Sequence, residues 1–80
     1  MTYVYILQSI DHSDQFYIGW TEELRGRVAA HNAGKSAHTS KFRPWKVVFY
    51  AAFNSKEKAI RFERYLKSGS GTVFRKRHLI

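Results

Sequence analysis

The chain has 80 residues, enough for one domain with a single modest hydrophobic core. Fourteen lysines and arginines against six acidic residues give a net charge of +8, which suits a polyanionic partner such as nucleic acid. The absence of cysteine excludes thiolate zinc sites and cysteine nucleophiles, and the sequence contains neither a membrane-spanning apolar run nor a signal-peptide pattern. We therefore expect a soluble cytoplasmic protein.

The first twenty residues have the pattern of a β-hairpin. Residues 3–8 alternate in polarity and are rich in Tyr, Val and Ile, and residues 16–20 form a second run of this kind. Residues 11–14, with the sequence Asp-His-Ser-Asp, are typical of the turn between two strands. The pattern predicts an antiparallel pair.

The middle of the chain is predicted to contain a helix, a loop and a third strand. Thr21 can serve as the N-cap of the helix and Gly34 as its C-terminal stop. Residues 35–45 show no period and contain Gly, Ser, Thr and Pro, which predicts a loop. Residues 47–53 are apolar throughout, which indicates a strand that is buried on both faces or central in the sheet.

A second helix is predicted over residues 55–68, capped by Asn54 or Ser55. Gly69-Ser70-Gly71 is typical of a turn, and the last ten residues are compatible with a short helix or a strand. The element order predicts a small layered α/β domain. In it, helices flank a three-stranded, mainly antiparallel sheet in the order β-β-α-β-α, followed by a short C-terminal element.

One carboxylate lies on the apolar side of the second predicted helix. At 100° per residue, the following side chains share one stripe: Ala59, Phe62, Glu63 and Leu66. Burying an ionised carboxylate without a partner costs several kcal/mol. We therefore expect an arginine, a metal ion or both to meet Glu63.

The first predicted helix also carries polar groups on its apolar face. The spacing i, i+3, i+4, i+7 is occupied by Leu24, Arg27, Val28 and His31. Tyr17 and Gly19 share one face of the second strand. Arg27, His31, two tyrosines and Glu63 can therefore converge on one site. An Arg27–Glu63 ion pair beside purely structural tyrosines is equally compatible with this spacing.

Basic residues are concentrated in two segments. The first, which contains no acidic residue, carries Lys35, Lys41, Arg43 and Lys46, and the second is Arg75-Lys76-Arg77. Aromatic residues lie near both segments in the sequence and can stack on bases while the cations contact phosphates. This combination favours nucleic-acid binding over an incidentally basic surface.

Several motifs together resemble a known family. Tyr3-Val4-Tyr5 is followed by Tyr17-Ile18-Gly19, then by Leu24-x-x-Arg27-x-x-x-His31-Asn32, and finally by Glu63 in a helix. In this order they resemble the GIY-YIG endonuclease superfamily, particularly its small stand-alone bacterial members related to the N-terminal domain of the excision-repair nuclease. The resemblance implies that residues 1–80 form a single nuclease domain.

The resemblance implies a metal-dependent phosphodiesterase in repair or recombination, with DNA favoured over RNA as its substrate. Glu63 would hold one Mg²⁺ or Mn²⁺ ion, and Arg27 would contact the scissile phosphate. Tyr5 or Tyr17 would position or deprotonate the attacking water, and His31 would relay a proton or orient the phosphate. The residues implied to contact nucleic acid are Gly19, Lys35, Lys41, Arg43, Lys46 and Lys67.

Target choice in such nucleases usually comes from an attached domain, so we expect weak or structure-dependent specificity, or a protein partner that supplies it. The alternative function is a nucleic-acid-binding module that cleaves poorly or not at all.

Overall fold

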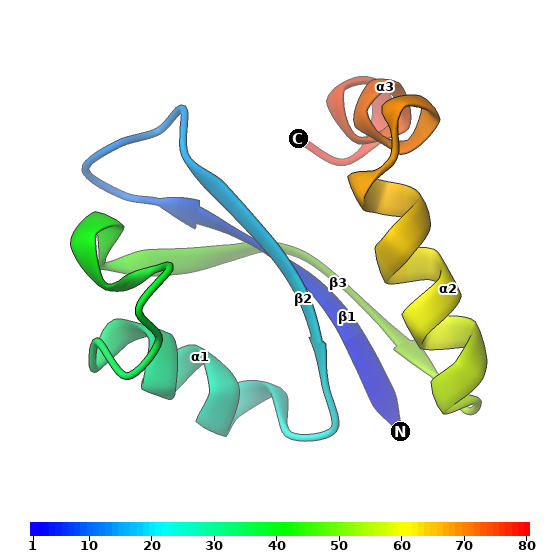
Figure 1. Cartoon of the computed structure of the whole chain (residues 1–80), viewed down its shortest axis with the longest axis horizontal. Coiled ribbons are helices and arrows are strands. Elements are labelled where there is room, and N and C mark those ends of the chain that lie inside the picture. The colour runs from blue at the N-terminus through cyan, green and yellow to red at the C-terminus, as the bar shows by residue number, and fades with distance from the viewer.

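The computed structural model describes residues 1–80 and confirms the α/β class. Strand β1 (Thr2–Ser9) is the centre of a three-stranded sheet, with β2 (Phe16–Thr21) and β3 (Trp45–Phe53) antiparallel to it on either side. Helix α1 (Leu24–Asn32) lies between β2 and β3 in the chain, and α2 (Lys56–Lys67) and α3 (Gly69–His78) follow β3 (Figure 1). The predicted hairpin and both predicted helices are confirmed.

Strand β1 is buried on both faces because the helices cover both sides of the sheet. Val4 and Ile6 pack in a cluster completed by Ile18 of β2 and by Ala59 and Leu66 of α2. Tyr5 and Leu7 point to the opposite face and pack with Trp45, against which Leu24 and Val28 of α1 also lie. Each such buried apolar side chain contributes about 1.5–3 kcal/mol to folding. Figure 1 shows α1 and the α2–α3 pair on opposite sides of the strands.

The prediction of a central or doubly buried third strand is wrong, because β3 is an edge strand. Val47 and Tyr50 are exposed. The register shifts between Ile6, which pairs with Phe49, and Leu7, which pairs with Val47, so that Val48 is an extra residue in a β-bulge. The bulge interrupts the two-residue alternation of side chains along β3.

The predicted N-cap of the first helix is also wrong by two positions. Glu23 caps α1, since its carboxylate accepts from the Gly26 amide at 3.3 Å, whereas the Thr21 hydroxyl accepts from the Glu23 amide at 3.1 Å. The predicted stop at Gly34 is confirmed by its φ of +78°, a value that favours glycine. The following loop contains one turn of 3-10 helix at Ser40–Phe42.

Helices α2 and α3 meet at a single serine. Ser68 donates to the Tyr65 carbonyl at 2.6 Å and accepts from the Gly71 amide at 3.1 Å, so it ends α2 and caps α3. The predicted turn at Gly69-Ser70-Gly71 is therefore wrong, because these residues form the first turn of α3. A Cβ on Gly71 would fall 1.7 Å from the Tyr65 carbonyl oxygen, which requires glycine at this junction. None of the helices has the length and apolar character needed to cross a bilayer.

Candidate active site

Tyr5 occupies the centre of the sheet on the face covered by α1. Its side chain is fully buried, and its ring lies 6.3 Å from the ring of Tyr17 and 6.0 Å from that of His31, measured between centroids. Gly19 is its partner on β2, and a Cβ at that position would lie 2.7 Å from the Tyr5 hydroxyl oxygen. The absence of a side chain at Gly19 therefore leaves the space through which the Tyr5 phenol extends.

His31 lies in the last turn of α1 and is 1 % exposed. Its Nε2 atom shares a hydrogen bond with the Tyr5 hydroxyl at 3.0 Å, and its Nδ1 atom shares one with the Thr39 hydroxyl at 2.8 Å. Burial, reinforced by the nearby charge of Arg27, lowers the pKa of His31 below its ordinary value of 6.5. The imidazole is consequently neutral at physiological pH, with one ring nitrogen free to accept a proton.

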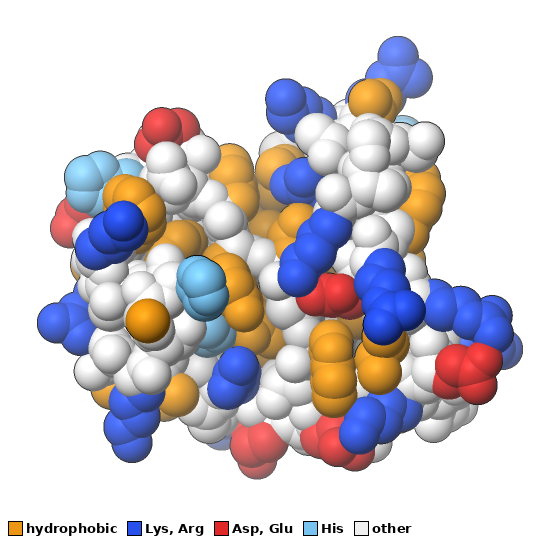
Figure 2. Space-filling model, in the orientation of Figure 1, with side chains coloured by type: hydrophobic (Ala, Val, Ile, Leu, Met, Phe, Trp, Pro, Cys, Tyr) orange, Lys and Arg blue, Asp and Glu red, His pale blue; other side chains and the backbone are white.

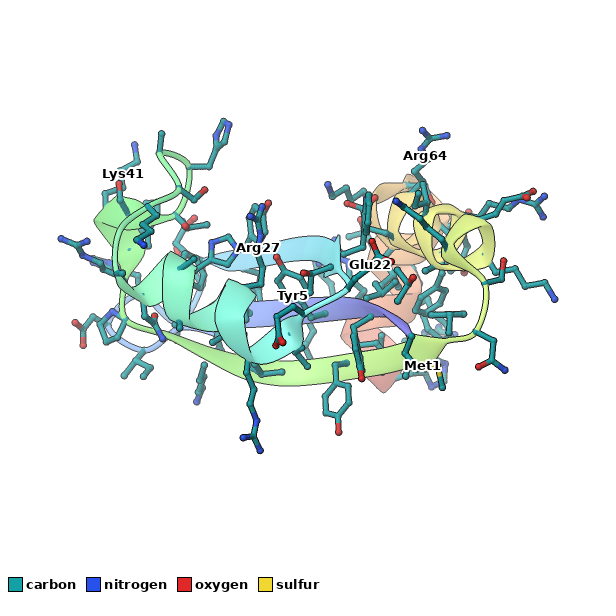
Figure 3. All side chains as sticks on the ribbon, turned by 90° about the horizontal axis from the view of Figure 1, so that it is seen from below. Met1, Tyr5, Glu22, Arg27, Lys41 and Arg64 are labelled. Carbon is teal, nitrogen blue, oxygen red and sulfur yellow. The ribbon has the colours of Figure 1, made fainter.

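Arg27 projects from α1 over the same tyrosines (Figure 3). The neighbouring Tyr5 phenol raises the pKa of the Arg27 guanidinium above its ordinary value. Burial raises the pKa of Tyr5 above 10.0, while Arg27 acts in the opposite direction. Arg27 makes no ion pair with any carboxylate, so its charge remains available to an anionic ligand.

Glu63 reaches this region from α2. The residue is 8 % exposed, and its Oε2 atom lies 2.7 Å from the Lys67 Nζ atom one helical turn later. The cation beside Glu63 is Lys67, so the expectation of an arginine partner is wrong, and with it the alternative of an Arg27–Glu63 ion pair. Figure 2 shows an acidic side chain near the middle of this face with basic side chains next to it.

These groups meet in one open pocket of about 470 Å³. Its lining consists of Tyr5, Tyr17, Gly19, Trp20, Thr21, Glu22, Arg27 and Glu63. Glu63 is the carboxylate held within the pocket, whereas Glu22 is exposed and pairs with Lys56 at 3.7 Å. The structure therefore brings together four of the five predicted catalytic residues, and His31 contacts the pocket through Tyr5. Their chemical roles stay predictions.

The basic residues predicted to contact nucleic acid are more dispersed. Lys35 lines a smaller cavity of about 50 Å³ together with Arg27 and His31. Arg27 also lines the main pocket. Lys41 and Lys46 are exposed outside both cavities, and Figure 3 shows Lys41 at the opposite end of the molecule from Arg64. The guanidinium of Arg43 packs against Gly34, which gives it a local structural contact as well.

Two features of the site are absent from the predictions. Thr39, which is 1 % exposed and contacts His31, lies in an irregular loop whose sequence gave no signal. The Lys67 contact with Glu63 follows the i, i+4 rule for helix surfaces and could have been found from the spacing alone.

Comparison with known proteins agrees with this arrangement. Residues 1–77 match the GIY-YIG catalytic domain. A UPF0213 protein of Streptococcus pyogenes serotype M3 is 39 % identical over 66 residues, which cover 81 % of this chain and 70 % of the relative. A UPF0213 protein of Streptococcus pneumoniae serotype 4 is 42 % identical over 66 residues, covering 81 % of this chain and 65 % of the relative.

A solved structure extends the similarity to three dimensions. The solution NMR structure of a UPF0213 protein from Bacillus halodurans is 36 % identical and superposes with a TM-score of 0.53, covering 92 % of this chain and 81 % of that one. The match of the catalytic domain over nearly the whole length, together with relatives above 30 % identity, establishes that the chain belongs to the GIY-YIG family of nucleases.

Proposed function

We propose that this protein is a metal-dependent endonuclease that hydrolyses phosphodiester bonds in DNA, with Tyr5, Tyr17, Arg27, His31 and Glu63 as its catalytic residues. The observation that carries the proposal is the pocket itself, which holds a donor-rich cation, two phenols and a nearly buried carboxylate within one cavity. Each kind of group serves a need of phosphodiester cleavage, because the cation can stabilise developing charge, a phenol can take a proton from water and the carboxylate can hold a metal ion.

Arg27 is the group best suited to the scissile phosphate. It is exposed to the pocket, has no carboxylate partner, and its planar guanidinium can donate to two phosphate oxygens at once. The negative charge that develops on these oxygens in the transition state strengthens both bonds. A lysine at this position supplies charge but not the paired geometry.

Glu63 fits a divalent ion, Mg²⁺ or Mn²⁺, that is held by one protein carboxylate. Glu63 is directed into the pocket, and no cluster of three His, Cys, Asp or Glu side chains exists that would instead form an all-protein metal cage. Mg²⁺ characteristically binds through one or two carboxylates, with water and substrate phosphate as its other ligands. When bound, such an ion supplies additional stabilisation of charge on the phosphate.

Tyr5 is the better placed of the two tyrosines to activate water. Its hydroxyl already contacts the neutral His31 imidazole, so a proton accepted from water by the Tyr5 oxygen can be balanced by release of the phenolic proton to His31 Nε2. The hydroxide formed attacks phosphorus, the P–O bond to the leaving sugar oxygen breaks, that oxygen takes a proton from solvent, and His31 returns its proton to solvent. Tyr17 makes no such bond to His31, and we assign it to orienting the water or the phosphate.

The basic side chains around the pocket support a polyanionic substrate. Lys35 on the α1 side and Lys67 on the α2 side flank the catalytic groups, and the net charge of +8 favours association with nucleic acid at low salt. We propose weak or structure-dependent specificity, or specificity supplied by a protein partner, in cytoplasmic DNA repair or recombination.

Nicking of supercoiled plasmid tests the proposal directly. Purified protein is incubated with plasmid, branched DNA or RNA, in Mg²⁺, Mn²⁺ or EDTA, alongside Arg27→Ala and Glu63→Ala. We expect metal-dependent nicking of DNA that falls at least about 100-fold in both variants. Salt-sensitive binding without cleavage, unchanged by Glu63→Ala, would instead identify a nucleic-acid-binding module.

A further inference from the structure

Thr39 is held against His31 by contacts that reach across the loop after α1. Its carbonyl accepts from the Trp45 indole Nε1 at 2.9 Å. Trp45 is fixed in turn by Asn32, whose side-chain amide accepts from the Trp45 backbone N–H at 2.6 Å and donates to its carbonyl at 3.2 Å. These contacts fix the backbone at Thr39, and they place its hydroxyl beside His31 Nδ1.

The hydrogen-bond partners of Tyr5 decide which nitrogen of His31 carries the proton. A buried neutral phenol needs an acceptor for its O–H, and Arg27 offers only donors. His31 Nε2 is the acceptor that the Tyr5 hydroxyl contacts. This geometry favours an unprotonated Nε2, with the single proton of the neutral imidazole on Nδ1.

The proton on Nδ1 then needs an acceptor of its own. The atom facing it at 2.8 Å is the Thr39 hydroxyl oxygen. We propose that Thr39 is a positioning residue, which holds His31 in the Nδ1–H tautomer and so keeps the Nε2 lone pair directed at the Tyr5 proton. The inference rests on the proposed function for its catalytic meaning, but the tautomer itself is a property of the protein without substrate.

The opposite arrangement makes a different prediction. If the Thr39 hydroxyl donated to Nδ1, the imidazole would carry its proton on Nε2, and an N–H donor would face the Tyr5 oxygen. In that tautomer Nε2–H donates to the Tyr5 oxygen, the phenolic hydrogen must turn to another acceptor, and Nε2 cannot receive the phenolic proton. Loss of the Thr39 oxygen should favour this inactive tautomer, because Nδ1–H would be left buried without an acceptor.

The first experiment reads the tautomer by NMR. In the full chain labelled with ¹⁵N-histidine, at a pH well above 6.5, long-range ¹H–¹⁵N spectra distinguish the protonated ring nitrogen from the free one. We expect the His31 proton on Nδ1 in the wild type and in Thr39→Ser, and on Nε2 in Thr39→Val, which has nearly the same shape without the hydroxyl. A wild-type protein protonated on Nε2 overturns the inference without any variant having to fold.

The second experiment measures plasmid nicking by the same proteins. We expect Thr39→Val to lose about 100-fold in kcat with KM unchanged, and Thr39→Ser to stay within about threefold of the wild type. A Thr39→Val protein with wild-type kcat overturns the positioning role. If the wild type itself does not nick DNA, the proposed function fails while the NMR result still decides the tautomer.

Discussion

Substitution of Gly19 by alanine should separate the proposed catalytic groups Tyr5 and His31 while leaving the protein folded. The added Cβ would lie 2.7 Å from the Tyr5 hydroxyl oxygen, 2.9 Å from its Cζ atom and 3.0 Å from Cε2 of Tyr17. Since ordinary contact begins at 3.4 Å, the phenol must retreat by roughly 0.7 Å, a displacement of the size that can cost an enzyme about 100-fold in rate. Its bond with His31, 3.0 Å in length, is lost or weakened by the same movement.

The stability change is smaller than the activity change. Overpacking a core typically costs about 1–3 kcal/mol of stability. Replacing glycine by alanine within a strand stabilises the fold by about 0.5–1 kcal/mol, because the unfolded chain has less conformational entropy to lose. We therefore expect Gly19→Ala to lose about 1 kcal/mol in its free energy of unfolding, which leaves the protein folded at room temperature.

Plasmid nicking and urea unfolding, measured on the same preparation, test this prediction. Gly69→Ala is the matched control, because nothing lies within 4 Å of the Cβ it adds and the residue is remote from the pocket lining. The control should keep full nicking activity and equal or slightly greater stability. Wild-type activity in Gly19→Ala would refute the reasoning that this glycine exists to admit the Tyr5 phenol.

Three further perturbations address the ion pair, the loop and the buried histidine. Lys67→Ala should tighten Mn²⁺ binding by about 1.4- to fivefold in titration calorimetry, because a partly exposed pair worth about 0.2–1 kcal/mol no longer competes for Glu63. Unchanged affinity would contradict binding of the ion by Glu63. Asn32→Ala should lower the free energy of unfolding by about 1–2 kcal/mol in urea, since the Trp45 backbone loses two partners, and a loss below about 0.3 kcal/mol would contradict this. Because the folded-state pKa of His31 is lowered, the unfolded chain binds its proton more readily, so stability is complete above about pH 6.5 and declines as the pH falls below it. His31→Gln should flatten that part of the stability curve, and an unchanged slope would show that another group causes it.

The predictable parts of the fold are those set by local pattern. The alternation along residues 3–8, the Gly34 stop and the apolar stripe of α2 each depend on neighbouring residues, and each appears in the structure as expected. The sheet order was not predictable in this way. The continuously apolar β3 lies at the edge, while the central β1 contains two tyrosines and a threonine, because burial depends on which strands the helices cover.

The residues of the candidate site likewise differ in whether local pattern predicts them. Three site residues can be identified from the sequence as polar residues at apolar helix positions: Arg27, His31 and Glu63. Alternation along the second strand likewise places Tyr17 and Gly19 on one face. Thr39 offers no such pattern, since it lies in an irregular loop and its contact with His31 depends on Asn32 and Trp45 folding the loop back. A residue placed by long-range loop packing, such as Thr39, can be identified only from the three-dimensional structure.

In the proposed role of Glu63 as an ion ligand, the ammonium of Lys67 against its carboxylate would make ion binding an exchange rather than a simple addition. If a divalent cation takes the carboxylate, the displaced Lys67 side chain becomes an unneutralised charge beside Glu63. That side chain can then engage the polynucleotide, so loading of the ion and capture of the substrate should reinforce one another. Reciprocity of linked equilibria requires that DNA, in turn, raises the affinity for the ion by the same factor.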